Sequence, residues 1–193
     1  MAKKVGVLAL QGDFEAHVKA LERAGAEPVL VNTREDLEKV DGLVIPGGES
    51  TTMLKIIDET GLRQPLADFA AQKPVFGTCA GAILMAKEVS NPAQFSFGAI
   101  DLAVERNAYG RQIDSRVATI EPDEEFSRRA GEGGMEAVFI RAPIIRRTGP
   151  GVRVLAEYQG DPVLVEQGKH LVATFHPELT SDPRVHQLFL SKL

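Results

Sequence analysis

Apolar residues in the first half of the chain follow two alternating spacings, one typical of buried strands and one typical of helices. Short continuous apolar runs predict strands covered on both faces at residues 5–10, 28–31, 42–45 and 74–77. Between them, helical spacing predicts helices through Phe14, Val18 and Leu21, after an N-cap at Ser50, at 62–72 and at 80–87. Because strands and helices alternate, this half predicts a doubly wound, largely parallel sheet.

The second half of the chain is richer in strands. They are predicted at residues 100–106, 117–120, 137–140, 152–158, 163–166 and 171–175, with Gly160-Asp161 as a candidate hairpin turn. Residues 182–193 predict a closing helix. No repeat or linker divides the chain, so we expect residues 1–193 to form a single domain. The predicted class is α/β, a three-layer sandwich around a mixed, mostly parallel central sheet.

Composition and charge narrow the class of protein. The chain has 193 residues, of which 44% are hydrophobic and 25% charged, as in an ordinary globular protein. A net charge of −5 without a block of Lys or Arg argues against nucleic acid as a partner. No apolar stretch is long enough to span a membrane, and the run at residues 5–10 is too short for a signal peptide. We therefore expect a cytoplasmic protein without a membrane partner.

The single cysteine, Cys79, lies in the sequence FGTCAGA, where an apolar strand meets a helix. Gly-x-Cys-x-Gly at such a junction is the cysteine counterpart of the nucleophile elbow, and Gly77 and Gly81 permit its sharp turn. The turn would place the thiol at the carboxyl edge of the sheet, with the backbone N–H of Ala80 facing a developing oxyanion. A buried cysteine can also be a small apolar core residue. The two flanking glycines favour the catalytic interpretation.

A cysteine nucleophile needs a base, and His176 is the strongest of the four histidines. It follows the apolar run LVATF and opens His-Pro-Glu, at the end of a predicted strand. Pro177 disfavours helix at His176, and in an extended chain residues two apart share a face. Glu178 could therefore reach back and orient the imidazole. The histidines are scattered and there is one cysteine, so we expect neither a metal site nor a cofactor.

A third motif, PGGEST, also lies between a predicted strand and a predicted helix. Its adjacent glycines, Gly47 and Gly48, expose backbone N–H groups and allow a ligand to approach closely. The segment could be an anion-binding nest, half of an oxyanion hole or a plain tight turn. No lysine follows at the spacing of a phosphate-binding P-loop.

These three motifs, in this order, resemble the class I (triad) glutamine amidotransferases, and among them the glutaminase subunits of pyridoxal 5′-phosphate synthases. The Cys elbow and His-Pro-Glu are shared by the whole class. More specific to the subunits are the blocks LQGDFEAH, GGESTTM, ERNAYGRQ and FIRAP. The matching blocks span residues 5–182, nearly the whole chain. The resemblance implies a flavodoxin-like fold and a glutaminase that releases ammonia for vitamin B6 synthesis.

The resemblance also implies a role for each matching residue. Cys79 would be the nucleophile, His176 the base and Glu178 its orienter, with the backbone N–H groups of Gly48 and Ala80 as the oxyanion hole. The implied glutamine-binding residues are Gly47, Gly48, Glu49, Arg106, Ile140 and Arg141. Chemically, Glu49 suits the ammonium group of glutamine, and Arg106 or Arg141 suits its carboxylate.

The same resemblance implies a partner. Ammonia would pass to a pyridoxal 5′-phosphate synthase subunit, in a large hetero-oligomer that carries glutaminase subunits on the outside of a synthase core. Gln11 lies where the family contacts that subunit. Many such glutaminases have almost no activity alone, because docking of the synthase subunit completes the oxyanion hole. We expect that reorganisation in the peptide near GGES, next to Gln11.

Three alternatives compete with this interpretation. The chain could be the glutaminase subunit of another amidotransferase pathway, which the blocks LQGDFEAH and ERNAYGRQ disfavour. It could be a Cys-elbow peptidase, glyoxalase or chaperone-like protein, which the late His-Pro-Glu disfavours. It could also be a binding module without activity, which the complete set of triad residues disfavours.

Overall fold

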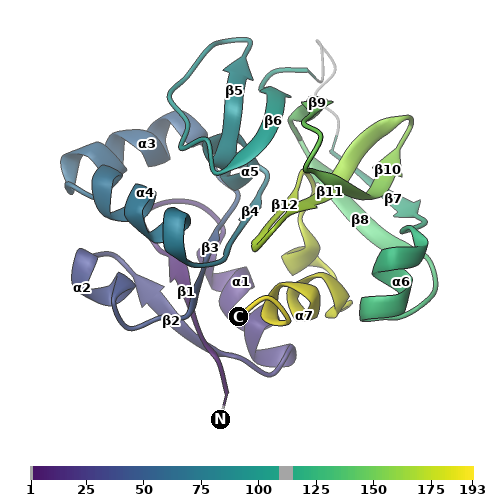
Figure 1. Ribbon diagram of the computed structural model, residues 1–193, viewed down its shortest axis with the longest axis horizontal. Helices are drawn as coiled ribbons and strands as arrows, with labels where there is room; N and C mark the ends of the chain where they lie inside the picture. The colour runs from purple at the N-terminus through teal and green to yellow at the C-terminus, as the bar shows by residue number, and fades with distance from the viewer. Residues whose placement is uncertain (1, 109–114) are drawn as a thin grey trace.

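A seven-stranded sheet runs through the centre of the computed structural model, which describes residues 2–108 and 115–193 (Figure 1). The strand order is β10-β11-β12-β4-β3-β1-β2. The strands are β1 (Lys4–Leu8), β2 (Glu27–Val31), β3 (Gly42–Ile45), β4 (Val75–Thr78), β10 (Arg153–Tyr158), β11 (Asp161–Gln167) and β12 (His170–Ala173). All pairings from β12 to β2 are parallel, and β11 pairs antiparallel with both neighbours. The predicted mixed, mostly parallel sheet is confirmed.

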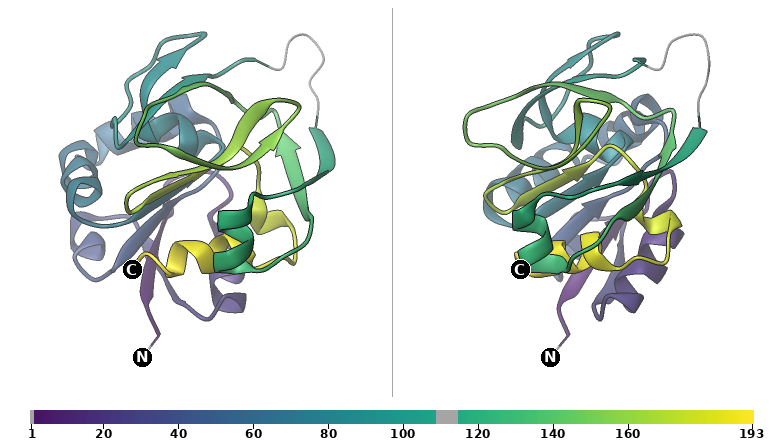
Figure 2. Two further views of the ribbon diagram at one scale, coloured as in Figure 1. Left: turned by 45° about the vertical axis from the view of Figure 1, so that its right-hand side comes forward. Right: turned by 90° about the vertical axis from the view of Figure 1, so that its right-hand side faces the viewer.

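Helices and further strands lie on both faces of this sheet and make the predicted sandwich (Figure 2), and an apolar cluster fills the space on each face. Successive residues of a strand point to opposite faces, so Val75 joins one cluster and Phe76 the other. The first cluster is closed by α2 (Arg34–Leu37), α3 (Ser50–Glu59), α4 (Arg63–Gln72), α5 (Ala80–Met85) and the strands β5 (Ala86–Ser90), β6 (Ile100–Glu105) and β9 (Ile144–Thr148). The second is closed by α1 (Phe14–Arg23), α6 (Glu124–Ala130), α7 (Arg184–Leu190) and the strands β7 (Ser115–Ile120) and β8 (Met135–Ile140).

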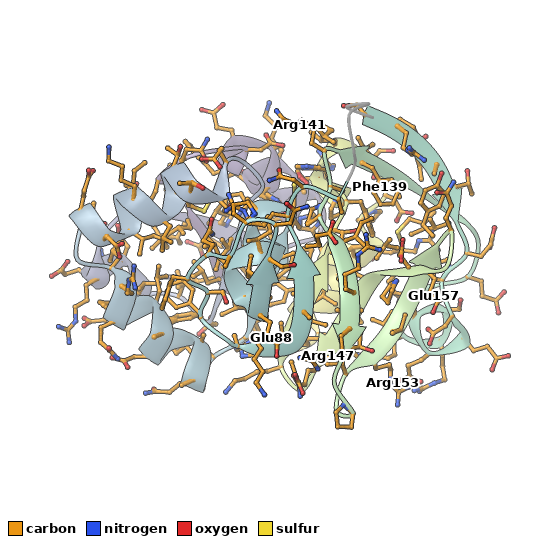
Figure 3. The ribbon with its side chains drawn as sticks, turned by 90° about the horizontal axis from the view of Figure 1, so that it is seen from above. Glu88, Phe139, Arg141, Arg147, Arg153 and Glu157 are labelled. Carbon is orange, nitrogen blue, oxygen red and sulfur yellow. The ribbon has the colours of Figure 1, made fainter. Side chains whose placement is uncertain are left out.

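Several strands of the second half lie outside the central sheet. β5, β6 and β9 form a three-stranded sheet, and β7 pairs with β8. Ion pairs tie the three-stranded sheet together, since Arg147 of β9 lies 3.7 Å from Glu88 of β5 and 3.1 Å from Asp101 of β6 (Figure 3). Burial alternates along β6 because only one of its faces meets the core.

Some boundaries and elements differ from the predictions. The helix predicted at 80–87 ends at Met85, because the chain becomes extended at Ala86 and continues as β5. The elements α2, β5, α6 and β9 were not predicted. In α2 the reason is its polar sequence, since Leu37 is its single buried residue. A capping box between Thr33 and Asp36 starts this short helix in place of an apolar pattern.

The loops after β1, β3, β4 and β12 carry most of the predicted site residues, whereas Arg106 follows β6, and Ile140 and Arg141 lie at the end of β8. These four strands are mutually parallel neighbours, so their carboxyl ends meet at one edge of the sheet. Within the described residues, none of the helices has the length and apolar content needed to cross a lipid bilayer.

Candidate active site

Cys79 lies on a tight turn between β4 and α5, as the sequence predicts. Its φ of 51° and ψ of −104° are unusual for a residue with a side chain, a strain of roughly 1–3 kcal/mol that the surroundings must hold. The backbone N–H of Cys79 donates to the carbonyl of Ala173 in β12 at 3.0 Å. A side chain at Gly81 would collide with the carbonyl of Ile45, and one at Gly77 would lie 2.6 Å from the backbone of Gly81. Both glycines are therefore required for the turn to pack.

His176 and Glu178 form a buried pair beside the thiol. Nδ1 of His176 lies 3.2 Å from Oε2 of Glu178. The predicted extended conformation is wrong from Pro177 onward, because residues 177–179 form a 3₁₀ turn, η1 (Pro177–Leu179). His176 itself is not helical, with φ −110° and ψ 84°. The turn, rather than strand periodicity, brings the carboxylate back onto the imidazole.

The surroundings of His176 favour its protonated form. Burial disfavours the charged ring, but hydrogen bonds to Cys79 and Glu178 outweigh it and raise the pKa of His176 to about 10. Burial also raises the pKa of Glu178, although the charge of His176 opposes that shift. At neutral pH the ring therefore carries a proton that it can give to a leaving group.

A pocket of about 670 Å³ opens over Cys79 and His176. That is ample for an amino acid, since ligand pockets commonly measure about 300–1,000 Å³. All the predicted glutamine-binding and oxyanion residues line it. They are Gly47, Gly48, Glu49, Ala80, Arg106, Ile140 and Arg141. Gln11 lies on the same wall, whereas Glu178 is buried behind His176.

The segment Gln11–Asp13 supports the glycine loop after β3. The side-chain oxygen of Gln11 accepts from the backbone N–H of Glu49 at 3.0 Å, and the N–H of Asp13 donates to the carbonyl of Gly47 at 3.0 Å. Gly48 has a φ of 152°, and a side chain there would strike Gln11. Asp13 therefore holds the Gly47–Gly48 peptide that carries the predicted oxyanion N–H, and Gln11 holds the next peptide, Gly48–Glu49.

Glu49, rather than Ser50, caps helix α3, so the predicted N-cap is wrong by one residue. The Glu49 carboxylate accepts from the N–H groups of Thr51 and Thr52 at 3.2 and 2.7 Å. Burial tends to raise the pKa of Glu49, but the hydrogen bonds from Thr52 and Thr51 outweigh it and lower the pKa. Ser50 is already helical, and its hydroxyl donates to Gln94 at 3.2 Å.

The two arginines approach the pocket from different elements. Nη2 of Arg106 donates to Oγ1 of Thr51 at 2.7 Å and lies 3.7 Å from the Glu49 carboxylate. Arg141 follows β8 with a φ of 47° (Figure 3), and the carbonyl of Ile140 lies 3.9 Å from the Cys79 sulfur. Residues 109–112 of the block ERNAYGRQ lie outside the described residues.

Comparison with known proteins assigns the family. The model of the SNO glutamine amidotransferase family matches residues 7–193. The chain belongs to this family. The Cys-elbow peptidase, glyoxalase and chaperone-like alternatives are therefore wrong.

Relatives of this SNO-family chain match it along almost its whole length. It is 68% identical to "Pyridoxal 5'-phosphate synthase subunit PdxT" of Solibacter usitatus, over 99% of this chain and 100% of that one. It is 59% identical to the protein of the same name from Koribacter versatilis, over 97% and 94% of the two chains. A solved structure described as "Crystal structure of glutamine amidotransferase" is 47% identical and has a TM-score of 0.88, covering 97% of both chains.

A more distant structure shares the fold. It is described as "Structure of PurLQS from Thermotoga maritima", has a TM-score of 0.72 and is 18% identical, with 99% of both chains covered. This likeness bears on the architecture alone.

Two residues of this SNO-family site were missed by the sequence analysis. Asp13 is half-buried in the pocket wall, and burial raises its pKa against the opposing charge of His176. His17 is fully buried, and its Nε2 lies 3.4 Å from Oε2 of Glu178. Both belong to LQGDFEAH, which follows a parallel strand at the edge that carries Cys79, and that position was the available signal.

Metal binding is disfavoured at the one suitable cluster among residues 2–108 and 115–193. Asp13, His176 and Glu178 place ligand atoms within 4.8 Å of one another. Nδ1 of His176 is already paired with Oε2 of Glu178 at 3.2 Å. The cluster suits acid–base chemistry better.

Proposed function

We propose that this chain hydrolyses L-glutamine to L-glutamate and ammonia, and that it supplies the ammonia to a pyridoxal 5′-phosphate synthase subunit. The observation that carries the proposal is the buried pair of His176 and Glu178, 3.2 Å apart, beside the strained Cys79 in a lined pocket. The names of relatives up to 68% identical over nearly the full length support the same reaction and pathway. We further propose that residues 1–193 act as one glutaminase domain.

The first half of the reaction is an acyl transfer to Cys79. The thiolate attacks the side-chain amide carbon of glutamine, and the carbonyl oxygen takes up the negative charge. The N–H groups of Gly48 and Ala80 stabilise that oxyanion. His176, oriented by Glu178, gives its proton to the amide nitrogen as the C–N bond breaks. Ammonia leaves, and a γ-glutamyl thioester remains on Cys79.

The second half of the reaction is hydrolysis of the thioester. His176, now neutral, takes a proton from water, and the resulting hydroxide attacks the thioester carbon. The same N–H groups hold the second oxyanion. Collapse of this intermediate breaks the C–S bond and releases glutamate. The proton on His176 is restored, so one water is consumed for each ammonia formed.

Glutamine is a zwitterion with a neutral amide tail, and the pocket offers a partner for each end. Ionised Glu49 suits the ammonium group, because a carboxylate that accepts two backbone N–H bonds still has unused lone pairs. Arg106 and Arg141 suit the carboxylate. Gly47 and Ile140 complete the walls on either side of the thiol.

The partner in this proposal is a synthase subunit in a large hetero-oligomer in the cytoplasm. We place its contact at Gln11, because this side chain holds the N–H of Glu49 and so controls the peptide after Gly48. Docking that moves Gln11 would free the Gly48–Glu49 peptide and so allow the adjoining N–H of Gly48, the proposed oxyanion donor, to reorient. Nucleic acid and membrane have no part in the proposal.

Glutamate release from glutamine tests the proposal. It should be measured with the native chain and with Cys79→Ala, each alone and with the synthase subunit. We expect turnover that rises with the synthase subunit and disappears in Cys79→Ala while the fold persists. Turnover that does not respond to the synthase would point instead to another amidotransferase pathway. No turnover in either condition would refute the glutaminase assignment.

A further inference from the structure

We infer that His17 is a positioning residue that holds Glu178 against His176 in the glutaminase reaction. The inference rests on the proposed function and adds a residue to its site. Nε2 of His17 lies 3.4 Å from Oε2 of Glu178, the same oxygen that lies 3.2 Å from His176. Two imidazoles from different parts of the chain thus converge on one carboxylate oxygen.

Two further contacts fix the ring of His17. Its Nδ1 lies 3.0 Å from Nε2 of His186 on helix α7, and its Nε2 lies 3.1 Å from the hydroxyl oxygen of Thr78. His17 and His186 are both fully buried, and so is Thr78. The ring of His17 is therefore held by α7 and by the end of β4, next to the Cys79 turn.

One tautomer of His17 fits these contacts. Burial and the charges of His186 and His176 lower the pKa of His17 well below 6.5, so one ring nitrogen donates and the other accepts. If Nε2 carries the hydrogen, its N–H donates to Thr78 beside the Glu178 carboxylate, and Nδ1 accepts from His186. The opposite tautomer would aim a lone pair at the carboxylate.

The far nitrogen of His186 supports the same assignment. Among the described residues, its Nδ1 has no hydrogen-bond partner. In the favoured tautomer this atom is an acceptor, whereas the alternative would leave a buried N–H unpaired, which proteins rarely tolerate. The hydrogen bonds therefore run from His186 through His17 to Thr78, and they hold the N–H of His17 beside the Glu178 carboxylate.

The consequence is a carboxylate kept ionised and in place. Glu178 is faced by His176 and His17, and Asp13 adds a like charge nearby that raises its pKa. His186 in turn lies next to His17, and burial together with the charge of Arg23 lowers its pKa. Oε1 of Glu178 has no partner among the described residues, and Nε2 of His17, which carries a neutral N–H, lies 3.4 Å from Oε2. Without His17, Glu178 would take up a proton more readily.

Two amide variants separate this role from mere packing. The amide of Gln reaches the position of ring Nε2, whereas the amide of Asn reaches the position of Nδ1. His17→Gln should therefore keep a donor on Glu178, and His17→Asn should keep only the contact with His186. We expect kcat in the complex with the synthase subunit to fall roughly tenfold or more in His17→Asn, with KM for glutamine unchanged. We expect His17→Gln to recover most of that loss.

His170→Asn is the matched control. His170 is also buried, and its Nδ1 accepts from the N–H of Val75 at 3.1 Å, at the opposite end of β4 from Cys79. The control should keep the native kcat. Thermal unfolding of all the variants shows whether a change in kcat follows from loss of fold.

The pH dependence of kcat distinguishes this role from a purely structural one, because a change in packing alone would leave its acid limb at the same pH. Loss of the His17 donor raises the pKa of Glu178, so the acid limb of kcat should move to higher pH in His17→Asn and return in His17→Gln. A native acid limb and native kcat in His17→Asn would overturn the inference. So would equal losses in both amide variants. Absence of glutamate release by the native complex would instead refute the proposed function itself.

Discussion

At the scale of single residues, Gly47 lies against the ring of His176 and leaves no room for a side chain. A Cβ at this position would collide with the imidazole and lie 3.4 Å from the Cβ of Cys79. In Gly47→Ala the ring must therefore move. We expect glutaminase activity to fall by roughly 100-fold, since a misplacement of about 1 Å can have that effect. The measurement is kcat in the complex, with the unfolding temperature as a check on the fold.

Gly151→Ala is the control for this change. A Cβ at Gly151 would meet only the flexible end of the Gln167 side chain, at 2.9 Å. Activity should stay native in this variant. If Gly47→Ala retained native activity, the ring of His176 could not lie where the structure has it.

The position of a site residue could be predicted from the sequence where a local motif determines it, but not where tertiary packing determines it. The positions of Cys79 and His176 at strand ends could be predicted because glycine and proline neighbours constrain their backbone. Glu49 and Ser50 were exchanged as the N-cap, because serine is the commoner cap and a glutamate must bend back to reach the same N–H groups. His17 lies on a helix with ordinary periodicity, and its contact with Glu178 spans 161 residues of chain.

At the scale of elements, the predictable segments were those with a buried face. Helix α6 has one buried residue, Phe126, so its sequence shows no apolar period. Its available signals were the Asp123 cap, acidic residues in its first turn and basic residues in its last. Strand β5 is rich in helix-forming residues, and it is extended because it pairs with β6.

The turn between α6 and β8 depends on one side chain of α7. The Arg184 guanidinium donates to the carbonyls of Gly131, Glu132, Gly133 and Gly134 at 2.9–3.1 Å, and to Asp182 at 2.7 Å. Arg184→Ala leaves these acceptors without their donor. We expect the free energy of unfolding to fall by about 2 kcal/mol, as measured by urea denaturation.

An exposed arginine provides the comparison for Arg184. Arg34 lies 3.9 Å from Glu38, and both side chains are largely exposed. Arg34→Ala should change the free energy of unfolding by about 0.5 kcal/mol or less. Equal losses in the two variants would mean that the Arg184 contacts add nothing beyond a surface pair.

At the scale of the whole molecule, strand order decides which loops meet. The sequence places Cys79 and His176 at strand ends but cannot say that those strands are neighbours. The parallel pairing of β12 with β4, with Ala173 opposite Thr78, brings the two residues together. The later strands return to this edge from distant parts of the chain, and no local pattern encodes that pairing.

The pH dependence of stability is a property of the whole molecule that its buried histidines control. Burial and the charge of Arg23 lower the pKa of His186 from 6.5 to about 3, so the folded chain keeps this ring neutral. The unfolded chain binds the proton below pH 6.5, so this contribution to stability is lost as the pH falls from 6.5 towards 3. His176 affects the stability at alkaline pH instead. With its pKa raised to about 10, its contribution is full below pH 6.5 and is lost as the pH rises towards 10.

Removing the His186 ring should therefore reduce the loss of stability at acid pH and leave the alkaline side unchanged, while His17 and His170, whose pKa values are also lowered, keep their share of the acid loss. Native protein and His186→Leu are compared by urea denaturation at pH 5.5, 7 and 8.5. Between pH 7 and 5.5 the native chain should lose roughly 1 kcal/mol more than the variant, because only the native unfolded state gains a proton at this position. Between pH 7 and 8.5 the two should change in parallel, since His176 is present in both. The carboxyls of half-buried Asp13 and buried Glu178 have raised pKa values and the opposite effect on stability, but they too are common to both chains and cancel in the difference. A difference that stayed constant from pH 5.5 to 8.5 would show that His186 is protonated alike in the folded and unfolded states.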